Sequence, residues 1–339
     1  MVQETTTARG PGVPAIAVAG ITKRYPGVVA NDNVSLDFFA GEIHVLLGEN
    51  GAGKSTLIAM LAGMQQPDAG QILLQGKPVR LASPRASLDH GIGTVFQHVL
   101  LVPSLSVIEN LMLGGPWWRR LHKGPALARF RELSGILGVE IDPDAQVGRL
   151  SLGQQQQVEI MRALWRGERV LILDEPTSML TPQGVHDLGE VLVRLRDKGV
   201  AIVLITHKLQ EAYSFGDRIS VLRLGRFVGE IGPDRLPGLS QAAVTDEVIH
   251  LMFGSGGYAS AEVAALIGQR REAASAIADL APRLIVRHLS TQAERGECPV
   301  RDVCFQLRPG EVLGIAGVDG NGQKHLAEVL AGQRPAAGG

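Results

Sequence analysis

Short apolar runs, separated by glycine and asparagine, recur along the first part of the chain. Residues 16–18, 34–38 and 43–47 (IHVLL) are rich in aliphatic and β-branched side chains, which favours strands. Two later runs, 170–173 (VLIL) and 201–205 (AIVLI), are apolar at every position and do not alternate. Continuous runs of this kind are typical of parallel strands that are buried on both faces. The pattern therefore predicts a sheet that is at least partly parallel.

Helical periodicity lies between several of these runs. It predicts one helix over residues 53–61 and another over 182–198, each followed closely by a glycine that would end it. The second helix connects two apolar runs, and this order predicts a βαβ crossover in an α/β fold. Residues from about 98 to 167 are mainly helical in pattern and are expected to form a separate lobe. The pattern of residues 218–231 predicts a hairpin that turns near Leu224–Gly225.

The composition narrows the class of protein. With 339 residues, 45% of them hydrophobic and 20% charged, the chain is expected to be globular and is long enough for more than one domain. Its 33 basic and 34 acidic residues give a net charge of −1, so no basic face for nucleic acid is indicated and we expect no nucleic-acid partner. The two cysteines, Cys298 and Cys304, exclude a disulfide framework and offer no zinc-ligand spacing.

Membrane insertion is not indicated by the sequence either. No apolar run approaches the roughly 18–20 residues that span a bilayer. The first residues (MVQETTTARG) lack the basic region and the long apolar core of a secretory signal. We therefore expect neither a transmembrane segment nor a signal peptide, and work at a membrane would require docking on a protein already there.

The chain repeats part of its own sequence. Residues 41–63 align without gaps on 310–332, with nine identical positions at a constant offset of 269 residues. A repeat of this kind predicts a duplicated domain. Between the copies, residues 254–282 are rich in glycine, alanine and serine and are interpreted as a linker. The predicted organisation is a first domain at 1–253, this linker, and a truncated second copy at 283–339.

A glycine-rich loop directly follows the predicted strand at 43–47. Its sequence fits G-x-x-x-x-G-K-[ST], a pattern in which inward-facing backbone N–H groups and a helix N-terminus bind phosphates. Lys54 would contact the β- and γ-phosphates of a nucleoside triphosphate, and the Ser55 hydroxyl would be a Mg²⁺ ligand. The predicted nucleotide-binding residues are Gly48, Glu49, Asn50, Gly51, Ala52, Gly53, Lys54, Ser55 and Thr56.

Acidic and histidine residues end two of the other predicted strands. Asp174 and Glu175 follow the run VLIL, and ligands of open α/β sheets bind at the carboxyl ends of strands. Isolated acids of this kind are more often solvated loop residues. Beside a phosphate loop, however, Asp174 would hold Mg²⁺ and Glu175 would orient or deprotonate the attacking water. For His207, at the end of the next strand, we favour a γ-phosphate contact over a structural role.

Two substitutions distinguish the second copy at this loop. Gln323 aligns with Lys54, and Lys324 aligns with Ser55, so the ammonium and the hydroxyl are missing from their places. Residues 283–339 also hold no counterpart of the acidic pair. We expect that the second copy neither binds nor hydrolyses ATP.

Residues 150–154 (LSLGQ) begin a predicted helix that extends to about Gly167. Ser151 and Gln154 have the spacing of a capping box, which any helix can use. A capped helix start that contains glycine also presents unpaired N–H groups, which can bind an anion. From the residues alone, both interpretations stay open.

Together these segments resemble the ATP-binding subunits of ABC transporters. LSLGQ is similar to their signature motif, VLILDEP to Walker B, and TVFQH to the Q-loop. The resemblance covers residues 16–230 and implies an α/β P-loop NTPase fold of the ABC ATPase type, with ATP and Mg²⁺ as cofactors. This fold has a mixed or parallel sheet core, an N-terminal antiparallel β-subdomain and a helical subdomain, here joined to an incomplete second copy.

The resemblance also assigns roles to individual residues. It implies that Tyr25 stacks on adenine, that Gln97 is a Mg²⁺ ligand beside the reaction centre, and that His207 is the switch histidine. It further implies that Ser151, Gly153 and Gln154 contact a nucleotide held by a second ATP-binding domain. That domain would belong to a homodimer or to a C-terminal half missing from this chain.

A narrower resemblance concerns the transported substrate. SMLTPQ at 178–183, LITHKLQEA at 204–212 and the tandem copy are similar to the duplicated ATPases of simple-sugar and nucleoside importers, and we favour the nucleoside type. This implies ATP hydrolysis that drives uptake through transmembrane permease subunits, with an extracytoplasmic substrate-binding protein as an indirect partner. The chain would then be peripheral, at the cytoplasmic face of the inner membrane.

Some residues depart from the family pattern. Leu152 replaces the first of the two glycines usual in the signature, and Thr181 stands where many ABC ATPases have an aspartate. Thr181 followed by Pro182 is also a good helix start. Trp117 and Trp118 would either contact the permease or pack within the lobe. Two other functions remain alternatives: a truncated, hydrolysis-deficient subunit, or a soluble twin-domain ABC protein that acts on ribosomes or DNA.

Overall fold

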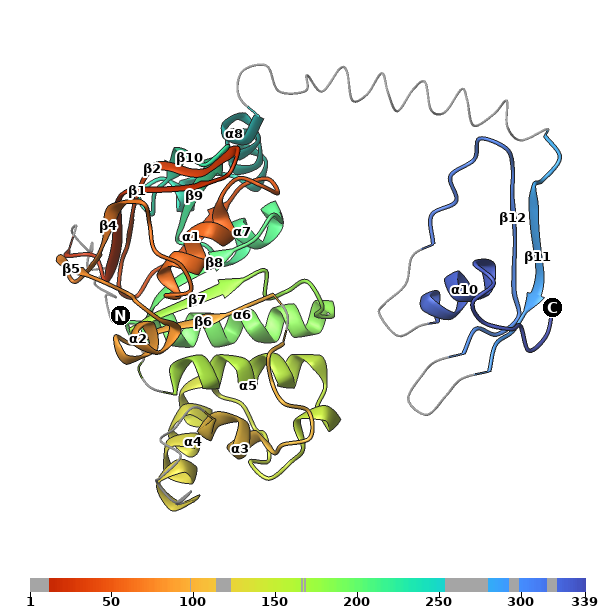
Figure 1. The fold of residues 1–339 in the computed structure, drawn as a ribbon, viewed down its shortest axis with the longest axis horizontal. Coiled ribbons are helices and arrows are strands. Elements are labelled where there is room, and N and C mark those ends of the chain that lie inside the picture. The colour runs from red at the N-terminus through yellow and green to blue at the C-terminus, as the bar shows by residue number, and fades with distance from the viewer. Residues whose placement is uncertain are drawn as a thin grey trace, which may run out of the picture. The chain divides into compact units, whose positions relative to one another are not determined.

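The computed structural model describes residues 12–97, 99–113, 123–165, 167, 169–253, 280–292, 299–315 and 322–339. The chain divides into two compact units, residues 1–255 and 256–339 (Figure 1). The sequence-predicted linker as far as residue 279, Cys298 and the pair Trp117–Trp118 lie outside the described residues. Among the helices that are described, none has both the length and the apolarity to cross a bilayer.

A six-stranded sheet forms the centre of the first unit, in the order β10-β9-β3-β8-β7-β6. Every neighbouring pair is parallel except β9 and β10, which form the hairpin predicted around Leu224–Gly225. The residues of β3 and β8 are all buried, as the continuous apolar runs predict. The strands are β3 (Ile43–Leu47), β6 (Ile92–Val95), β7 (Val170–Asp174), β8 (Ala201–Ile205), β9 (Arg218–Arg223) and β10 (Arg226–Ile231).

An antiparallel sheet of four strands, in the order β2-β1-β4-β5, makes up the N-terminal part. The strands are β1 (Ile16–Tyr25), β2 (Val28–Phe38), β4 (Ala69–Leu74) and β5 (Lys77–Val79). β1 and β2 are longer than the apolar runs predict, because the pairing continues through irregular positions at which Gly20 and Asn33 adopt φ of 62° and 52°. Such bulges interrupt the alternation of apolar residues that a sequence pattern detects.

Helices cover the sheets and form a lobe. α3, α4 and α5 pack on one another at the end of the unit away from β1, β2 and β4 (Figure 1), as the helical pattern between 98 and 167 predicts. The α-helices of this unit are α1 (Lys54–Leu61), α2 (Pro84–Asp89), α3 (Val107–Met112), α4 (Lys123–Leu137), α5 (Leu152–Leu164), α6 (Pro182–Asp197), α7 (Leu209–Phe215) and α8 (Gln241–Phe253). Two short 3₁₀ turns, Val147–Arg149 and Leu236–Gly238, complete the described helical elements.

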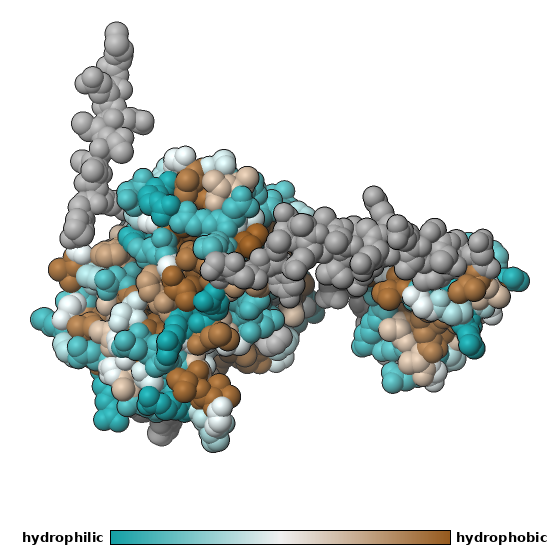
Figure 2. All heavy atoms as spheres, turned by 90° about the horizontal axis from the view of Figure 1, so that it is seen from above, coloured by the Kyte–Doolittle hydropathy of each residue, from teal (hydrophilic) through white to brown (hydrophobic). Residues whose placement is uncertain are grey.

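The second unit is small and has a thin core. It contains the hairpin pair β11 (Leu284–Leu289) and β12 (Val303–Leu307), together with α10 (Gln323–Leu330). Among its described residues, the core cluster consists of four buried residues, Val286, Leu289, Val300 and Leu326, with four partly buried neighbours. Apolar atoms are visible on the surface of this unit, at the right of Figure 2, and Val312 is 96% exposed.

Candidate functional site

The glycine-rich loop turns tightly between β3 and α1. Gly53 caps the helix with φ 97° and ψ 2°, a left-handed conformation that suits glycine. A Cβ atom on Gly53 would lie 2.3 Å from the Ala30 carbonyl oxygen, and one on Gly48 would lie 2.5 Å from that of Leu222. Both positions therefore require glycine, and the loop is held closely against neighbouring backbone.

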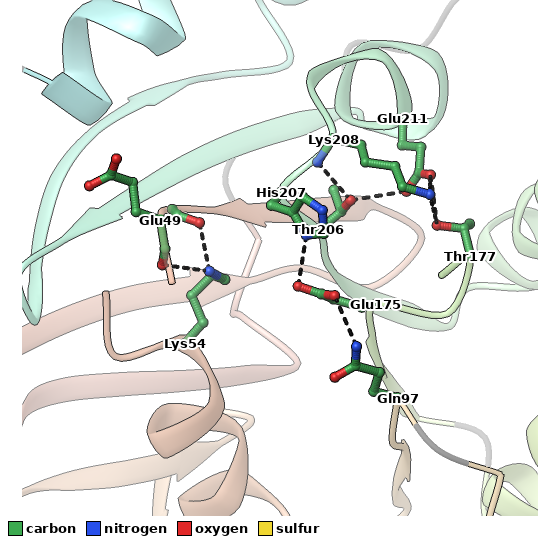
Figure 3. A network of polar contacts seen from close by, with 10 residues as sticks. Glu49, Lys54, Gln97, Glu175, Thr177, Thr206, His207, Lys208 and Glu211 are labelled. Carbon is green, nitrogen blue, oxygen red and sulfur yellow. Dashed lines mark hydrogen bonds and ion pairs between the residues drawn. The ribbon is translucent and has the colours of Figure 1, made fainter. Parts of the chain in front are cut away.

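Lys54 is folded into the loop. Its Nζ donates hydrogen bonds to the carbonyl oxygens of Gly48 and Glu49, at 2.6 and 2.9 Å (Figure 3). Burial lowers the pKa of the Lys54 ammonium, whereas the carboxylates of Glu175, Asp174 and Glu49 oppose that shift. These carbonyl contacts keep the ammonium beside the loop, where phosphate oxygens would bind.

Asp174 lies at the carboxyl end of β7, facing the same space. Burial raises the pKa of its carboxyl group, the neighbouring Glu175 adds to that shift, and Lys54 opposes it. Asp174, Gln97 and Ser55 line one cavity, and their carboxylate, amide and hydroxyl oxygens are the hard donors that Mg²⁺ prefers. A bound cation would lower the pKa of Asp174 again, because its positive charge favours the carboxylate. This donor set therefore fits Mg²⁺. When bound, the ion would neutralise phosphate charge.

Glu175 contacts both of the other predicted catalytic residues, His207 and Gln97. Its Oε1 lies 2.9 Å from Nδ1 of His207, and its Oε2 accepts a hydrogen bond from Nε2 of Gln97 at 3.3 Å (Figure 3). The backbone of Glu175 has φ of 46°, and its N–H donates to the carbonyl oxygen of Ile205 at 2.9 Å. A carboxylate held in this way is suitable for accepting a proton from a water molecule in the cavity.

These groups line a cavity of about 490 Å³. Tyr25 is 40% exposed and belongs to the lining, and its hydroxyl contacts the side chain of Gln65. Gly48 and Glu49 are not part of the lining, although their carbonyl groups hold Lys54. The lining residues are Tyr25, Val28, Ala30, Asn50, Gly51, Ala52, Gly53, Lys54, Ser55, Thr56, Gln97, Asp174, Glu175 and His207.

The segment LSLGQ lies elsewhere in the first unit. Ser151, Gly153 and Gln154 are absent from the cavity lining and begin α5. Ser151 and Gln154 form the predicted capping box, with Gln154 N–H donating to Ser151 Oγ at 3.3 Å and Ser151 N–H donating to Gln154 Oε1 at 3.1 Å. A Cβ atom on Gly153 would meet nothing within 4 Å, so this helix start is open to solvent or to another molecule.

A buried polar network behind His207 was not predicted from the sequence. Glu211 on α7 accepts hydrogen bonds from Thr177 at 2.6 Å and from Thr206 at 3.0 Å, and its carboxylate lies 2.9 Å from Nζ of Lys208 (Figure 3). Thr177, Thr206 and Glu211 are 3%, 1% and 7% exposed. The network connects the segment after Glu175 with the residues on either side of His207. Thr177 and Glu211 are 34 positions apart, and no local pattern indicates their contact.

A second residue missed from the sequence, Asn31, supports the phosphate loop. Its side chain is fully buried, and Nδ2 donates to the Gly53 carbonyl oxygen at 3.2 Å. The hairpin turn after β9 also contacts this region, because the Gly225 N–H donates to the Ala52 carbonyl oxygen at 3.1 Å. Asn31 opens the polar run NDN at residues 31–33 of β2, so the sequence gives no signal that singles it out for such a role.

Comparison with known proteins agrees with this geometry. Residues 31–178 match the model of the ABC transporter family. Over these residues the first unit belongs to the ABC transporter family. In a crystal structure of the ADP conformation of MJ1267, an ATP-binding cassette of an ABC transporter, a similar fold is seen with a TM-score of 0.62 and 25% identity over 71% of this chain and 99% of that one. An ABC ATP-binding domain of this kind binds nucleotide.

Curated relatives are similar over nearly the whole chain. The glucose import ATP-binding protein TsgD13 of Haloferax volcanii is 40% identical, and the alignment covers 96% of this chain and 62% of that protein. The nucleoside import ATP-binding protein NupA of Lactococcus lactis subsp. cremoris is 38% identical, with 94% and 60% covered. The chain therefore spans about three fifths of the length of these relatives, at 62% and 60%.

Proposed function

We propose that this chain is the ATP-binding and ATP-hydrolysing subunit of an ABC importer for a simple sugar or a nucleoside. The observation that carries the proposal is the single cavity in which Lys54, Asp174, Glu175 and His207 lie together. Lys54 and the loop would hold the phosphates, Asp174 would hold Mg²⁺ with Ser55 and Gln97, and Glu175 would act on the attacking water. The named import proteins support the choice of substrate class.

A second ATP-binding domain is part of the proposal. The start of α5 presents Ser151, Gly153 and Gln154 away from this cavity. These residues would contact the phosphates of a nucleotide bound to a partner domain, because an open helix start binds anions well. The partner would be a second copy of the chain or a C-terminal half.

The permease would dock on a groove beside the lobe. This groove has a volume of about 510 Å³ and lies among α2, β6, α3 and α5, with Leu88, Phe96, Leu113 and Trp165 in its lining. Its apolar area suits an amphipathic helix from a membrane protein. Docking there would hold the chain at the cytoplasmic face of the membrane, and an extracytoplasmic binding protein would deliver the substrate to the permease.

We further propose that residues 283–339 are a degenerate second copy of the ATP-binding domain. Support comes from Gly322, which caps α10 with φ 88° and ψ 2°, close to the conformation of Gly53. Gln323 follows it in the place of Lys54, so this copy would lack the phosphate-binding ammonium.

Nucleotide binding and turnover of the purified chain test the main proposal. Glu175→Gln keeps the shape of the side chain but removes the base, so we expect ATP binding within twofold of wild type and turnover lowered by about 100-fold or more. Lys54→Ala should lose nucleotide binding itself. Thr181→Ser, which keeps the N-cap hydroxyl of α6, is the matched control and should change neither quantity. Equal turnover by wild type and Glu175→Gln would contradict the role of Glu175.

A second candidate function is a subunit that binds ATP but does not hydrolyse it alone. It is favoured by the position of the signature residues away from the cavity. Under this alternative, wild type and Glu175→Gln both bind ATP without turnover. Addition of an intact partner domain would then restore hydrolysis to wild type only.

A further inference from the structure

Three side chains with metal-binding atoms meet on the β11–β12 hairpin. His288 Nδ1 lies 2.7 Å from Asp302 Oδ1, and the backbone N–H of His288 donates to Cys304 Sγ at 3.1 Å. One donor atom from each of the three side chains lies within 4.8 Å of the other two. All three residues are exposed, so an ion from solution could reach them.

The first unit has the same bulge without these side chains. There the N–H of Gly20 donates to Ser35 Oγ at 2.9 Å, as that of His288 does to Cys304. Likewise, the N–H of Asn33 donates to Thr22 Oγ1 at 3.1 Å, and that of Asp302 donates to Ser290 Oγ at 3.1 Å. Gly20, Asn33 and Ser35 thus occupy the places of His288, Asp302 and Cys304.

This comparison shows which features of the bulge depend on backbone conformation and which depend on side-chain type. Asn33, His288 and Asp302 adopt φ of 52°, 53° and 53°, and Gly20 adopts 62°. Glycine accepts this region without strain, whereas residues with a side chain are uncommon there. Since glycine, asparagine and serine already form the bulge, its geometry does not require an imidazole, a carboxylate and a thiol.

We propose that His288, Asp302 and Cys304 bind a transition-metal ion of the Zn²⁺ class. Imidazole nitrogen, thiolate sulfur and carboxylate oxygen are the three protein ligands of Zn²⁺, whereas Mg²⁺ prefers oxygen alone. Ligands of one Zn²⁺ lie roughly 3–4 Å apart at its bond lengths, so small side-chain rotations bring these atoms together. Water would complete the coordination.

Such an ion would fasten β11 to β12. His288 belongs to β11, Cys304 belongs to β12, and Asp302 directly precedes β12. The unit has a core cluster of only four buried residues among those described, so a metal bridge between its two strands would add to a small hydrophobic contribution.

Cobalt provides a spectroscopic test on the full chain, without nucleotide or magnesium. Co²⁺ bound to a thiolate absorbs in the near ultraviolet, and we expect one such site per chain that Zn²⁺ displaces. Cys304→Ser should abolish the band. His288→Gly and Asp302→Asn should each weaken Co²⁺ binding by about tenfold or more. These three variants place the residues of the first unit at the same bulge, so folding of the hairpin is expected to be retained.

Cys298→Ser is the matched control, because it removes the other thiol and should leave the band unchanged. Zn²⁺ should also slow amide exchange in β11 and β12 of wild type, and not in Cys304→Ser. The proposal is overturned if no band forms, if the band survives Cys304→Ser, or if His288→Gly and Asp302→Asn both leave the affinity unchanged.

Discussion

The glycine that begins α1 and the glycine that begins α10 have nearly the same backbone conformation, but the strands before them differ. Gly53 has φ 97° and Gly322 has φ 88°, each with ψ 2°. Before Gly53, residues 43–47 form the buried strand β3. At the aligned positions before Gly322, Val312, Leu313 and Ile315 form no strand and are 96%, 40% and 53% exposed.

This difference shows which parts of a phosphate site are local. The left-handed glycine and the helix that follows it are determined by a few residues, and both are present in each unit. The cavity also depends on neighbouring strands. His207 follows β8, which pairs with β3, and Asp174 ends β7, which pairs with β8, and this pairing brings both residues to the cavity that Lys54 lines. A segment without those strands can keep the shape of the loop's end and still lack a site.

The largest effect is expected from giving the first loop the residue at the aligned position of the second unit, Gln323. Lys54→Gln removes the ammonium that holds the carbonyl groups of Gly48 and Glu49. Charged hydrogen bonds to phosphate contribute roughly 1.5–3 kcal/mol, so we expect ATP affinity to fall by about 10- to 100-fold. Equilibrium titration with ATP measures this change, and Lys54→Arg, which keeps the charge, should lose less.

The difference between local and distant features also explains what the sequence predicts. The glycine-rich loop, the Ser151–Gln154 cap and the Thr181 helix start are local patterns, and the structure contains all three. The Glu211 network and the meeting of His288 with Cys304 depend on how distant segments pair.

The full lengths of β1 and β2 could not be predicted from the sequence, for a related reason. β1 and β2 continue past positions with positive φ, where the side-chain alternation that marks a strand is broken. The carboxyl ends of β7 and β8, in contrast, were predictable, since parallel neighbouring strands place Asp174 and the residue after Thr206 at one edge.

A smaller effect is expected from the Glu211 network, which has no counterpart among the described residues of the second unit. Glu211→Gln keeps the size of the side chain but removes the charge facing Lys208, and it disturbs the partners of Thr177 and Thr206. His207 should then be less well placed, so we expect kcat for ATP hydrolysis to fall by roughly tenfold. The KM for ATP should change by less than twofold, because Glu211 does not line the cavity.

Steady-state kinetics separate these two parameters. Glu190→Gln on the exposed part of α6 is the control and should match wild type. A rise in KM with unchanged kcat would mean that the network supports binding and does not position His207.

A third comparison concerns His44 on β3 and its effect on how folding stability depends on pH. This side chain is buried, its Nε2 lies 2.8 Å from Ser220 Oγ, and the aligned residue in the second unit is Leu313. Burial, followed by the charge of Arg218, lowers the pKa of His44 from 6.5 to about 3. Between these values the unfolded chain binds a proton that the folded chain does not. Folding stability therefore falls as the pH is lowered through this window.

His44→Leu should remove that dependence. From pH 7 to pH 5.5, the wild-type free energy of unfolding should fall by about 1 kcal/mol through His44, and this part should vanish in the variant. Urea unfolding of both proteins at the two pH values measures the difference. His186→Leu, at an exposed position on α6, is the control and should keep the full slope. An equal slope for His44→Leu would mean that His44 is not the responsible group.

The smallest effect is expected from the reverse exchange, which tests the comparison most directly. In the Lys54→Gln background, Gln323→Lys with Lys324→Ser restores the ammonium and the hydroxyl behind Gly322. If the glycine turn and two side chains were sufficient, ATP binding would return. We expect the ATP affinity to change by less than twofold, because residues 312–315 form no strand and residues 283–339 contain no acidic pair like Asp174–Glu175. Recovery of binding above that limit would show that a phosphate site needs only the local turn, and that the surrounding sheet contributes little to it.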